Sequence, residues 1–144
     1  MTGNDFSRLI DQAYGFFLKD FGFVMDELVT GGRFYSVMFT NDTNAVCVSH
    51  EPGDVTPAVL IFTLTNGRRS NIDDRSATPR LTDLNTKFMN TITKAERAAN
   101  DLAFKSVSAK DPEERQLLKA AKELRLVLPK YLGASKQTIR TIPN

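Results

Sequence analysis

Residues suited to catalysis or metal binding near neutral pH are few in this 144-residue chain, which contains one histidine, His50, and one cysteine, Cys47. His50 precedes Glu51, but neighbours on a strand point to opposite faces of a sheet, so we do not expect a catalytic dyad. Cys47 lies in a predicted strand, where it is expected to act as a small buried apolar residue rather than a reactive thiol. These residues provide no set of metal ligands.

Carboxylate pairs and phosphate-binding motifs give no stronger signal. Asp73-Asp74 lacks the further oxygen ligands of a calcium loop. Glu113-Glu114 is typical of a helix start, and Asp26-Glu27 of surface charge. The sequence has no Gly-x-Ser-x-Gly motif and no glycine-rich phosphate loop. The residues therefore favour no enzyme activity, metal or cofactor, although carboxylates from distant parts of a chain can converge on an acid–base site.

The segment 66–80 is the most suggestive for function. It contains one large apolar residue and several arginines, namely Arg68, Arg69, Arg75 and Arg80. A connection of about fifteen residues is long for a compact domain, and such loops are often functional or disordered. A mobile crossover loop is the favoured interpretation of this segment. In the alternative, functional interpretation, Arg68, Arg69 and Arg75 are the candidate contacts to an acidic partner protein.

The net charge of +2 is unevenly spread along the chain. Residues 1–66 hold three basic and eight acidic residues, whereas residues 67–144 hold sixteen basic and nine acidic. Two solvated faces of opposite sign explain this distribution, and a basic surface for an acidic partner is the alternative. The basic residues of a nucleic-acid surface would be the loop arginines with Lys119, Lys122 and Arg125. Because the pI of about 8.8 is modest and aromatic residues are not interleaved with them, nucleic acid is not the expected partner.

Size and composition predict one domain over residues 1–144. Hydrophobic residues make up 41% and charged residues 25%, as in an average globular protein. The first residues lack a basic leader followed by an apolar segment, and no apolar run reaches the roughly 18 to 20 residues of a membrane span. We therefore expect a cytoplasmic protein without a membrane segment.

Apolar residues at helical spacing predict a first helix from about Asp5 to Phe21. Asn4 or Asp5 can cap its start, and Gly22 suits the left-handed position that ends a helix. Gly15 is unfavourable inside a helix, so another element is expected to approach closely there. Four strands are predicted next, over residues 22–30, 33–40, 45–51 and 56–65. Their short connections, including a two-residue turn at Gly31-Gly32, imply an antiparallel meander.

Two long helices are predicted after the arginine loop. The first carries an apolar stripe from Leu81 through Ala99 to Leu102, and its β-branched middle, residues 91–93, is expected to bend or break. The second begins at residues 111–114, Asp-Pro-Glu-Glu, which combine a cap, a first-turn proline and a capping-box glutamate. Pro129 is expected to kink or end the regular helix, and Gly133 to stop it.

This order of elements predicts an α+β protein, built as a two-layer sandwich of an N-terminal helix, a four-stranded antiparallel β-meander and two long C-terminal helices. The helices are expected to cover one face of the sheet and to leave the other partly solvated. The tail, residues 134–144, is expected to be flexible or to add an edge strand through Ile139 and Ile142.

Three stretches also carry a resemblance: Phe16-Phe-Leu-Lys-Asp-Phe-Gly-Phe23, Arg80-Leu-Thr-Asp-Leu-Asn85 and Leu124-Arg-Leu-Val-Leu-Pro-Lys-Tyr-Leu132. Their order resembles that of small uncharacterised bacterial α+β proteins, some of which are similar to immunity proteins of bacterial toxin systems. The shared features are a helix end, a helix start and core leucines. The resemblance therefore implies an architecture and a protein that binds another protein, and it assigns no functional residue.

Together these patterns favour a small protein-binding module, with the immunity type as one form. Its binding surface would be a sheet face, a sheet edge or the arginine loop. A small-molecule binder or enzyme with a pocket between sheet and helices is the first alternative, and a weak nucleic-acid binder is the second. The sequence does not indicate the oligomeric state.

Overall fold

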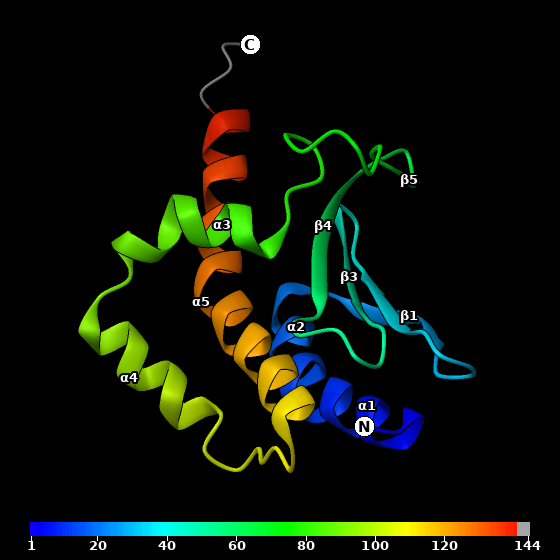
Figure 1. Ribbon diagram of the computed structural model, residues 1–144. Helices are drawn as coiled ribbons and strands as arrows, with labels where there is room; N and C mark the ends of the chain where they lie inside the picture. Colours follow the sequence, from blue (N-terminus) through cyan, green and yellow to red (C-terminus); the bar gives the residue numbers. More distant parts are fainter. Residues whose placement is uncertain (141–144) are drawn as a thin grey trace.

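A computed structural model describes the backbone of residues 1–140 and the side chains of residues 1–134. An N-terminal helical segment is followed by a curled antiparallel sheet and then by C-terminal helices (Figure 1), so the α+β class is confirmed. Residues 141–144, which include Ile142 of the predicted tail, lie outside the described residues.

The N-terminal helical segment is continuous from Gly3 to Phe21 but changes its winding. Its parts are α1 (Gly3–Leu9), a π-helical stretch (Ile10–Gly15), α2 (Phe16–Leu18) and a 3-10 turn (Lys19–Phe21). Thr2, rather than Asn4 or Asp5, is the N-cap. Its hydroxyl accepts a hydrogen bond from the Asp5 N–H at 3.1 Å, and the Asp5 carboxylate accepts one from the Thr2 N–H at 3.0 Å.

Two glycines fix how this segment meets the sheet. Gly22 ends it at φ 81°, as predicted. The close approach predicted at Gly15 occurs instead at Gly3, where an added Cβ would lie 2.9 Å from the carbonyl oxygen of Thr30. An added Cβ on Gly15 would meet only atoms of its own helix, at 3.7 Å or more. The beginning of α1 is therefore packed against the end of the first strand.

The four predicted strands are antiparallel neighbours in chain order, so the meander is confirmed. They are β1 (Val24–Val29), β2 (Tyr35–Thr40), β3 (Asn44–His50) and β4 (Ala58–Thr65). The turn between β1 and β2 is longer than the two residues predicted, and within it only Gly32 has a positive φ. A bulge between Met25 and Glu27 interrupts the pairing of β1 with β2.

The segment after β4 is more ordered than its composition suggests. Asn66 and Gly67, at φ 51° and 76°, form a tight turn into β5 (Arg68–Arg69), a short fifth strand antiparallel to β4. The loop that follows is fastened to β4, because the Thr63 hydroxyl donates to the Ala77 carbonyl at 2.7 Å. The prediction of four strands is therefore wrong by one. The Asn-Gly pair, a strong hairpin signal, was present in the sequence.

The helix predicted from Leu81 to Leu102 is broken in its middle, as its β-branched residues indicated. It consists of α3 (Leu81–Phe88), a 3-10 turn (Met89–Thr91) and α4 (Lys94–Ala103). Thr93 caps the start of α4 directly after the break, because its hydroxyl accepts the Glu96 N–H at 3.0 Å. The break also rotates the predicted stripe away from the core. Leu102 is 70% exposed, and α4 instead buries Asn100.

The last helix, α5 (Pro112–Arg140), begins where predicted but runs past both expected stops. Asp111 caps it by accepting the Glu114 N–H at 2.8 Å. Pro129 is exposed, so water can replace the hydrogen bond that proline cannot donate. Gly133 and Ile139 both lie within the helix, and the predicted edge strand is wrong for the described part of the tail.

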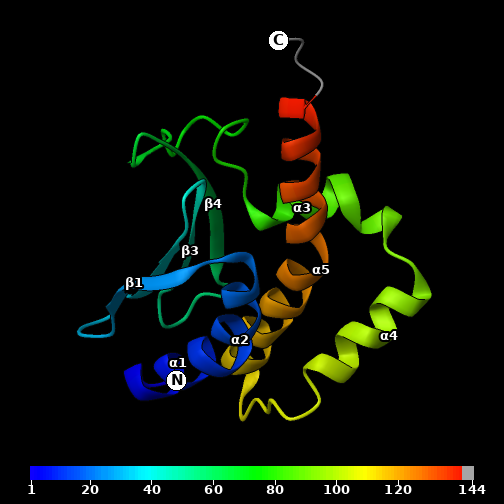
Figure 2. The same cartoon turned by 180° about the vertical axis from the view of Figure 1, so that it is seen from behind.

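One large core lies between the sheet and the N-terminal helical segment, α3 and α5. Across it the Tyr14 hydroxyl donates to the Leu117 carbonyl at 2.8 Å. The helix α4 packs on the side of α5 that faces away from the sheet (Figures 1 and 2). The predicted sandwich is therefore wrong in detail, because the sheet has a fifth strand and α4 does not cover it.

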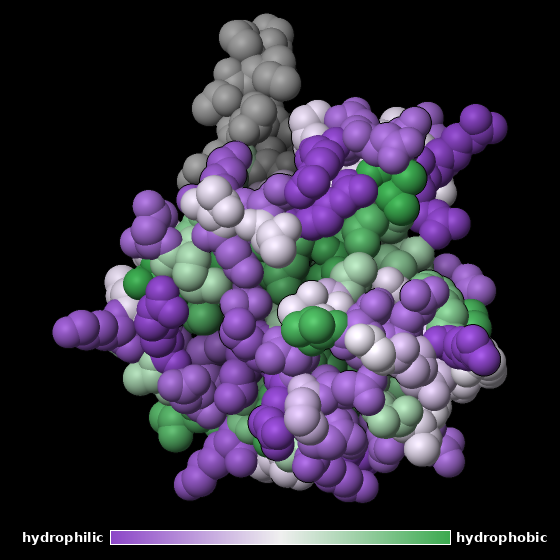
Figure 3. Space-filling model, viewed as in Figure 1, coloured by the Kyte–Doolittle hydropathy of each residue, from purple (hydrophilic) through white to green (hydrophobic). Residues whose placement is uncertain are grey.

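The opposite side of the sheet, here called the outer face, is covered only in part, as predicted. Its residues include a small cluster with Ala45, Leu60 and Phe62 buried and Met38, Cys47 and Leu64 partly buried. Figure 3 shows apolar surface along β4, bordered by hydrophilic side chains of the loop that follows β5.

Candidate functional site

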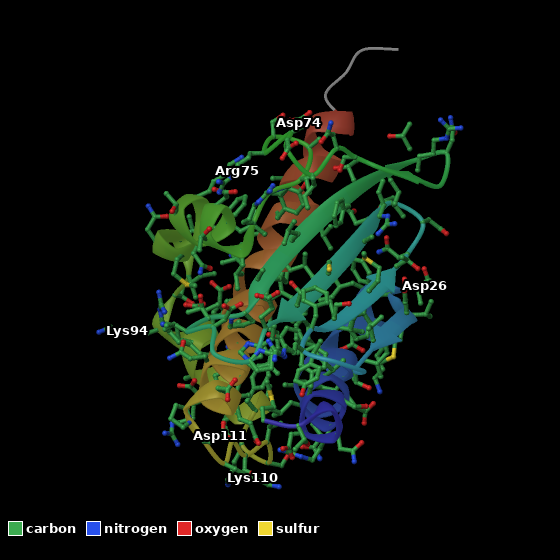
Figure 4. All side chains as sticks on the ribbon, turned by 45° about the vertical axis from the view of Figure 1, so that its right-hand side comes forward. Asp26, Asp74, Arg75, Lys94, Lys110 and Asp111 are labelled. Carbon is green, nitrogen blue, oxygen red and sulfur yellow. The ribbon has the colours of Figure 1, made fainter. Side chains whose placement is uncertain are left out.

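The arginines predicted as partner contacts lie in two places. Arg68 and Arg69 form the exposed strand β5, at the end of the β4–β5 hairpin. Arg75 lies in the following loop, near Asp74 and above the sheet in Figure 4. Its guanidinium donates to both carboxylate oxygens of Asp83 in α3, at 2.6 and 3.1 Å. The structure therefore brings Arg68 and Arg69 together and engages Arg75 in an internal ion pair.

Asp83 is the point at which the arginine loop is attached to α3. Besides the two bonds from Arg75, its carboxylate accepts the backbone N–H of Arg80 at 2.9 Å. The hydrogen bonding of Arg75 and then of this N–H lowers the pKa of Asp83 below its ordinary value. The Arg80 side chain in turn donates to the Thr78 carbonyl at 2.7 Å. Arg75 and Arg80 thus stabilise the loop, which leaves Arg68 and Arg69 for contacts outside the molecule.

A groove of about 360 Å³ crosses the outer face between the β1–β2 region and the β4–β5 hairpin. It is lined by Asp26, Glu27, Met38, Thr40, Asn41, Leu64, Gly67 and Arg69. One wall carries two carboxylates from β1, and the opposite wall carries the Arg69 guanidinium. That guanidinium lies 5.7 Å from the centre of the Phe62 ring, a cation–π contact that helps to hold it over the outer face. The groove therefore has opposite charges on its two walls, with both polar and apolar side chains, among them Asn41 and Leu64, between them.

The strand β1 is the exposed edge beside this groove, and within residues 1–140 it pairs with no strand other than β2. All six of its residues are exposed. Four of them are apolar, with exposed fractions of 65% for Val24, 44% for Met25, and 37% for both Leu28 and Val29. Exposed apolar edges invite pairing with another chain, so proteins usually cover or blunt them. In β1, the features that discourage pairing with another chain are the bulge and the two acids in the middle of the strand.

A second groove, of about 450 Å³, lies on the other side of β1, between that strand and the N-terminal helical segment. Its lining residues are Asp11, Gly15, Phe16, Lys19, Phe23, Val24, Met25 and Phe39. Three of these are aromatic, and the two charged side chains belong to the helical segment. The edge strand therefore borders one groove through Asp26 and Glu27 and the other, largely aromatic groove through Val24 and Met25.

His50 has a partner that its sequence neighbours do not reveal. Its Nε2 lies 2.7 Å from Oε2 of Glu113 in the first turn of α5. This hydrogen bond is the main cause that lowers the pKa of Glu113. The imidazole, at the end of the inner strand β3, is fully buried, so the pair joins β3 to α5. The two residues are 63 positions apart, and no local signal in the sequence links them.

A second long-range ion pair fastens α1 to the start of α5. The Arg8 guanidinium lies 2.7 Å from Oε1 of Glu114, a carboxylate that is 1% exposed. The same oxygen accepts the Lys110 N–H at 3.1 Å, so the capping-box bond predicted to the Asp111 N–H is displaced by one residue. Both acids of the predicted helix start therefore stabilise tertiary contacts.

Other chemistry finds little support in the described part of the chain. Among those residues, no group of three or more His, Cys, Asp or Glu side chains is placed to hold a metal ion. Cys47 packs with the outer-face cluster, where burial raises the pKa of its thiol. None of the described helices has the length and apolar character needed to cross a membrane.

Comparison with known proteins adds no family. No family model matches the chain, and comparison with the curated proteins and with the solved structures found no match. The resemblance to immunity proteins therefore stays a prediction, and the function has to be argued from the geometry of the site.

Proposed function

We propose that this chain is a protein-binding module that uses the outer face of its sheet together with the β1 edge. The observation that carries the proposal is the exposure of all six β1 residues, four of them apolar, next to a groove with opposite charges on its walls. An apolar edge of this kind is an aggregation liability unless a partner covers it. A surface that combines apolar and charged groups is also typical of protein interfaces.

A pocket between the sheet and the helices, the first alternative, has less support. The space between them is filled by side chains such as Phe17, Val46 and Leu124, each at most 1% exposed. The two grooves beside β1 lie on the surface, whereas sites for small molecules usually enclose most of their ligand.

A nucleic-acid surface, the second alternative, is weakened by the partners of its predicted members. Arg75 and Arg80 stabilise the loop, and the Arg125 guanidinium donates to Asn100 at 2.9 Å. Acidic side chains also line the outer groove, where they would repel phosphates.

Arg68 and Arg69 remain our proposed contacts to acidic residues of the partner, and an immunity protein is one form that this module could take. Arg75 contributes indirectly, by holding the loop that follows β5. Binding through these exposed charges would be steered by electrostatics and weakened by salt.

Affinity purification from the native host tests the proposal. The wild-type chain would be compared with Arg68→Glu/Arg69→Glu and with a matched control, Lys94→Glu/Lys105→Glu, whose two exposed lysines have no side-chain partner among the described residues. We expect the same host protein to be recovered with the wild-type chain and the control at low salt, and to be depleted with the arginine variant. Recovery of no specific protein by the wild-type chain would overturn the proposal, and equal recovery by all three chains would remove the arginines from it.

A further inference from the structure

We infer that the free edge of β1 is a strand-addition site for an extended segment of a partner protein, with apolar side chains on one of its faces and lysine or arginine on the other. This inference rests on the proposed function and specifies the partner that the module would bind.

The backbone of β1 offers free hydrogen-bonding groups. The strand pairs with β2 on one side only, and no other hydrogen bond of residues 24–29 is present within the described part of the chain. Residues 27–29 pair regularly with residues 36–38 beyond the bulge, so this half of the edge is extended and presents alternate N–H and C=O groups. Added strands bind such edges through main-chain hydrogen bonds and obtain specificity from pockets for alternate side chains.

The grooves on the two sides of β1 could receive the alternating side chains of an added strand. Side chains of successive residues in an added strand would point to opposite sides of the sheet. On the core side, at the start of β1 before the bulge, they would meet the aromatic groove, which contacts the strand at Val24 and Met25 and is also lined by Phe16, Phe23 and Phe39. On the outer side they would meet the groove whose nearest wall is formed by Asp26 and Glu27. One set of side chains should therefore be apolar and the other basic.

The charge on the edge selects the partner. Neither Asp26 nor Glu27 has a hydrogen bond or ion pair with any described side chain, and Figure 4 shows Asp26 at the open edge of the sheet. If two copies of this chain paired antiparallel through the middle of β1, their acids would lie opposite one another, and like charges in that position destabilise a sheet. Lysine or arginine on the added strand would neutralise the same acids. A basic segment of another protein therefore fits this edge better than a second copy does.

Designed peptides provide a probe that does not require the natural partner. The test peptide has seven residues that alternate valine and lysine. One control peptide replaces lysine by glutamate, and another has the valine–lysine composition in two blocks. Fluorescence anisotropy with the full chain at low salt would measure each affinity. We expect the alternating valine–lysine peptide to bind at least about tenfold more tightly than either control, because only this peptide matches both sides of the edge.

Charge reversal on the protein locates the site. Asp26→Lys/Glu27→Lys should abolish the preference for the lysine peptide and favour the glutamate peptide. Asp42→Lys/Asp54→Lys changes the same net charge at exposed turn positions and should leave the preference intact. Circular dichroism would verify that both variants are folded. Binding that does not depend on alternation, or that survives Asp26→Lys/Glu27→Lys unchanged, would overturn the inference.

Two further outcomes separate this inference from the proposed function. A concentration-dependent dimer of the wild-type chain that Asp26→Lys/Glu27→Lys changes would overturn the choice of occupant in favour of a second copy. If a host protein recovered by the wild-type chain also binds Asp26→Lys/Glu27→Lys with unchanged affinity, the strand-addition site is wrong while the protein-binding function stands.

Discussion

The two sides of the sheet differ in how completely they are covered. The core side is closed by large apolar side chains of the N-terminal helical segment and α5, and long-range polar pairs fasten its margins. The outer face has only a small apolar cluster, and the edge strand beside it leaves apolar side chains and unpaired acids in solvent. Stability therefore depends on the first region, and the second region is the one to which we assign the proposed partner binding. The following predictions test that division.

The largest expected difference is between leucines in the two regions. Leu124 is fully buried in α5, whereas Leu28 on β1 is 37% exposed. Leu124→Ala should lower the free energy of unfolding by about 2–5 kcal/mol, because it removes buried methyl groups and leaves a cavity. The same substitution at Leu28 should cost less than about 1 kcal/mol. Urea denaturation of both variants measures the difference, and equal losses would contradict the division.

Next in size is the pair that joins α1 to α5. Arg8→Ala would leave the buried Glu114 carboxylate without its cation, and Oε2 of that carboxylate already has no hydrogen-bond partner among the described residues. We expect a loss of about 2 kcal/mol, reduced from the cost of a fully buried pair because Arg8 is 28% exposed. Arg115→Ala is the matched control, since that side chain is exposed. A loss as large in the control would show that helix propensity, rather than the ion pair, is responsible.

A smaller effect should depend on pH through Glu113. Its pKa is lowered in the folded state, so its ionised form stabilises the fold above the ordinary value of 4.5. This contribution is lost as the pH falls through the lower folded-state pKa. Glu113→Gln should therefore be less stable than the wild type near neutral pH, by less than about 1 kcal/mol because the carboxylate is partly exposed, and the gap should shrink in acid.

Denaturation curves from pH 7 to pH 3 would follow this gap, with Glu51→Gln, a change at an exposed position, as the control. A gap of constant size over the whole range would show that Glu113 contributes through packing rather than through its charge.

The smallest expected change in stability distinguishes the arginines. Arg75→Ala removes an exposed ion pair with Asp83 and should cost less than about 1 kcal/mol, while hydrogen exchange of the amides in residues 76–80 becomes faster. Arg68→Ala should change neither quantity. If Arg68→Ala speeds exchange in this loop as much as Arg75→Ala does, the structural difference between the two arginines is wrong.

Much of the fold could be predicted because its signals are local. Gly22 ends the first helical segment, Asp111 caps α5, and the β-branched residues 91–93 break the helix between α3 and α4. The Asn66-Gly67 turn is an equally local signal, although the overall composition of residues 66–80 predicts a loop. The continuation of α5 past Pro129 could not be predicted from local sequence, because it depends on which side of the helix faces solvent.

The candidate site was harder to predict than the fold. The sequence indicated a sheet edge and the arginine loop as possible surfaces, and the structure places Arg68 and Arg69 on one hairpin beside the outer groove. The sequence did not indicate that Arg75 would pair with Asp83. Nor did it indicate that the acids of β1 would form the wall of the outer-face groove opposite Arg69. Those relations depend on side chains that meet only after the sheet has curled.

By itself, the sequence determined the kinds of elements, most of their ends and their antiparallel order, because caps, turns and hydrophobic periodicity act within a few residues. Only the tertiary structure decided which strand is an exposed edge. Apolar residues in β1 resemble those in β2, and the difference is that β2 has a strand on each side while β1 has one. The pairs His50–Glu113 and Arg8–Glu114 were decided in the same way, since each joins residues that are distant in the chain and become neighbours when the helices pack against the sheet.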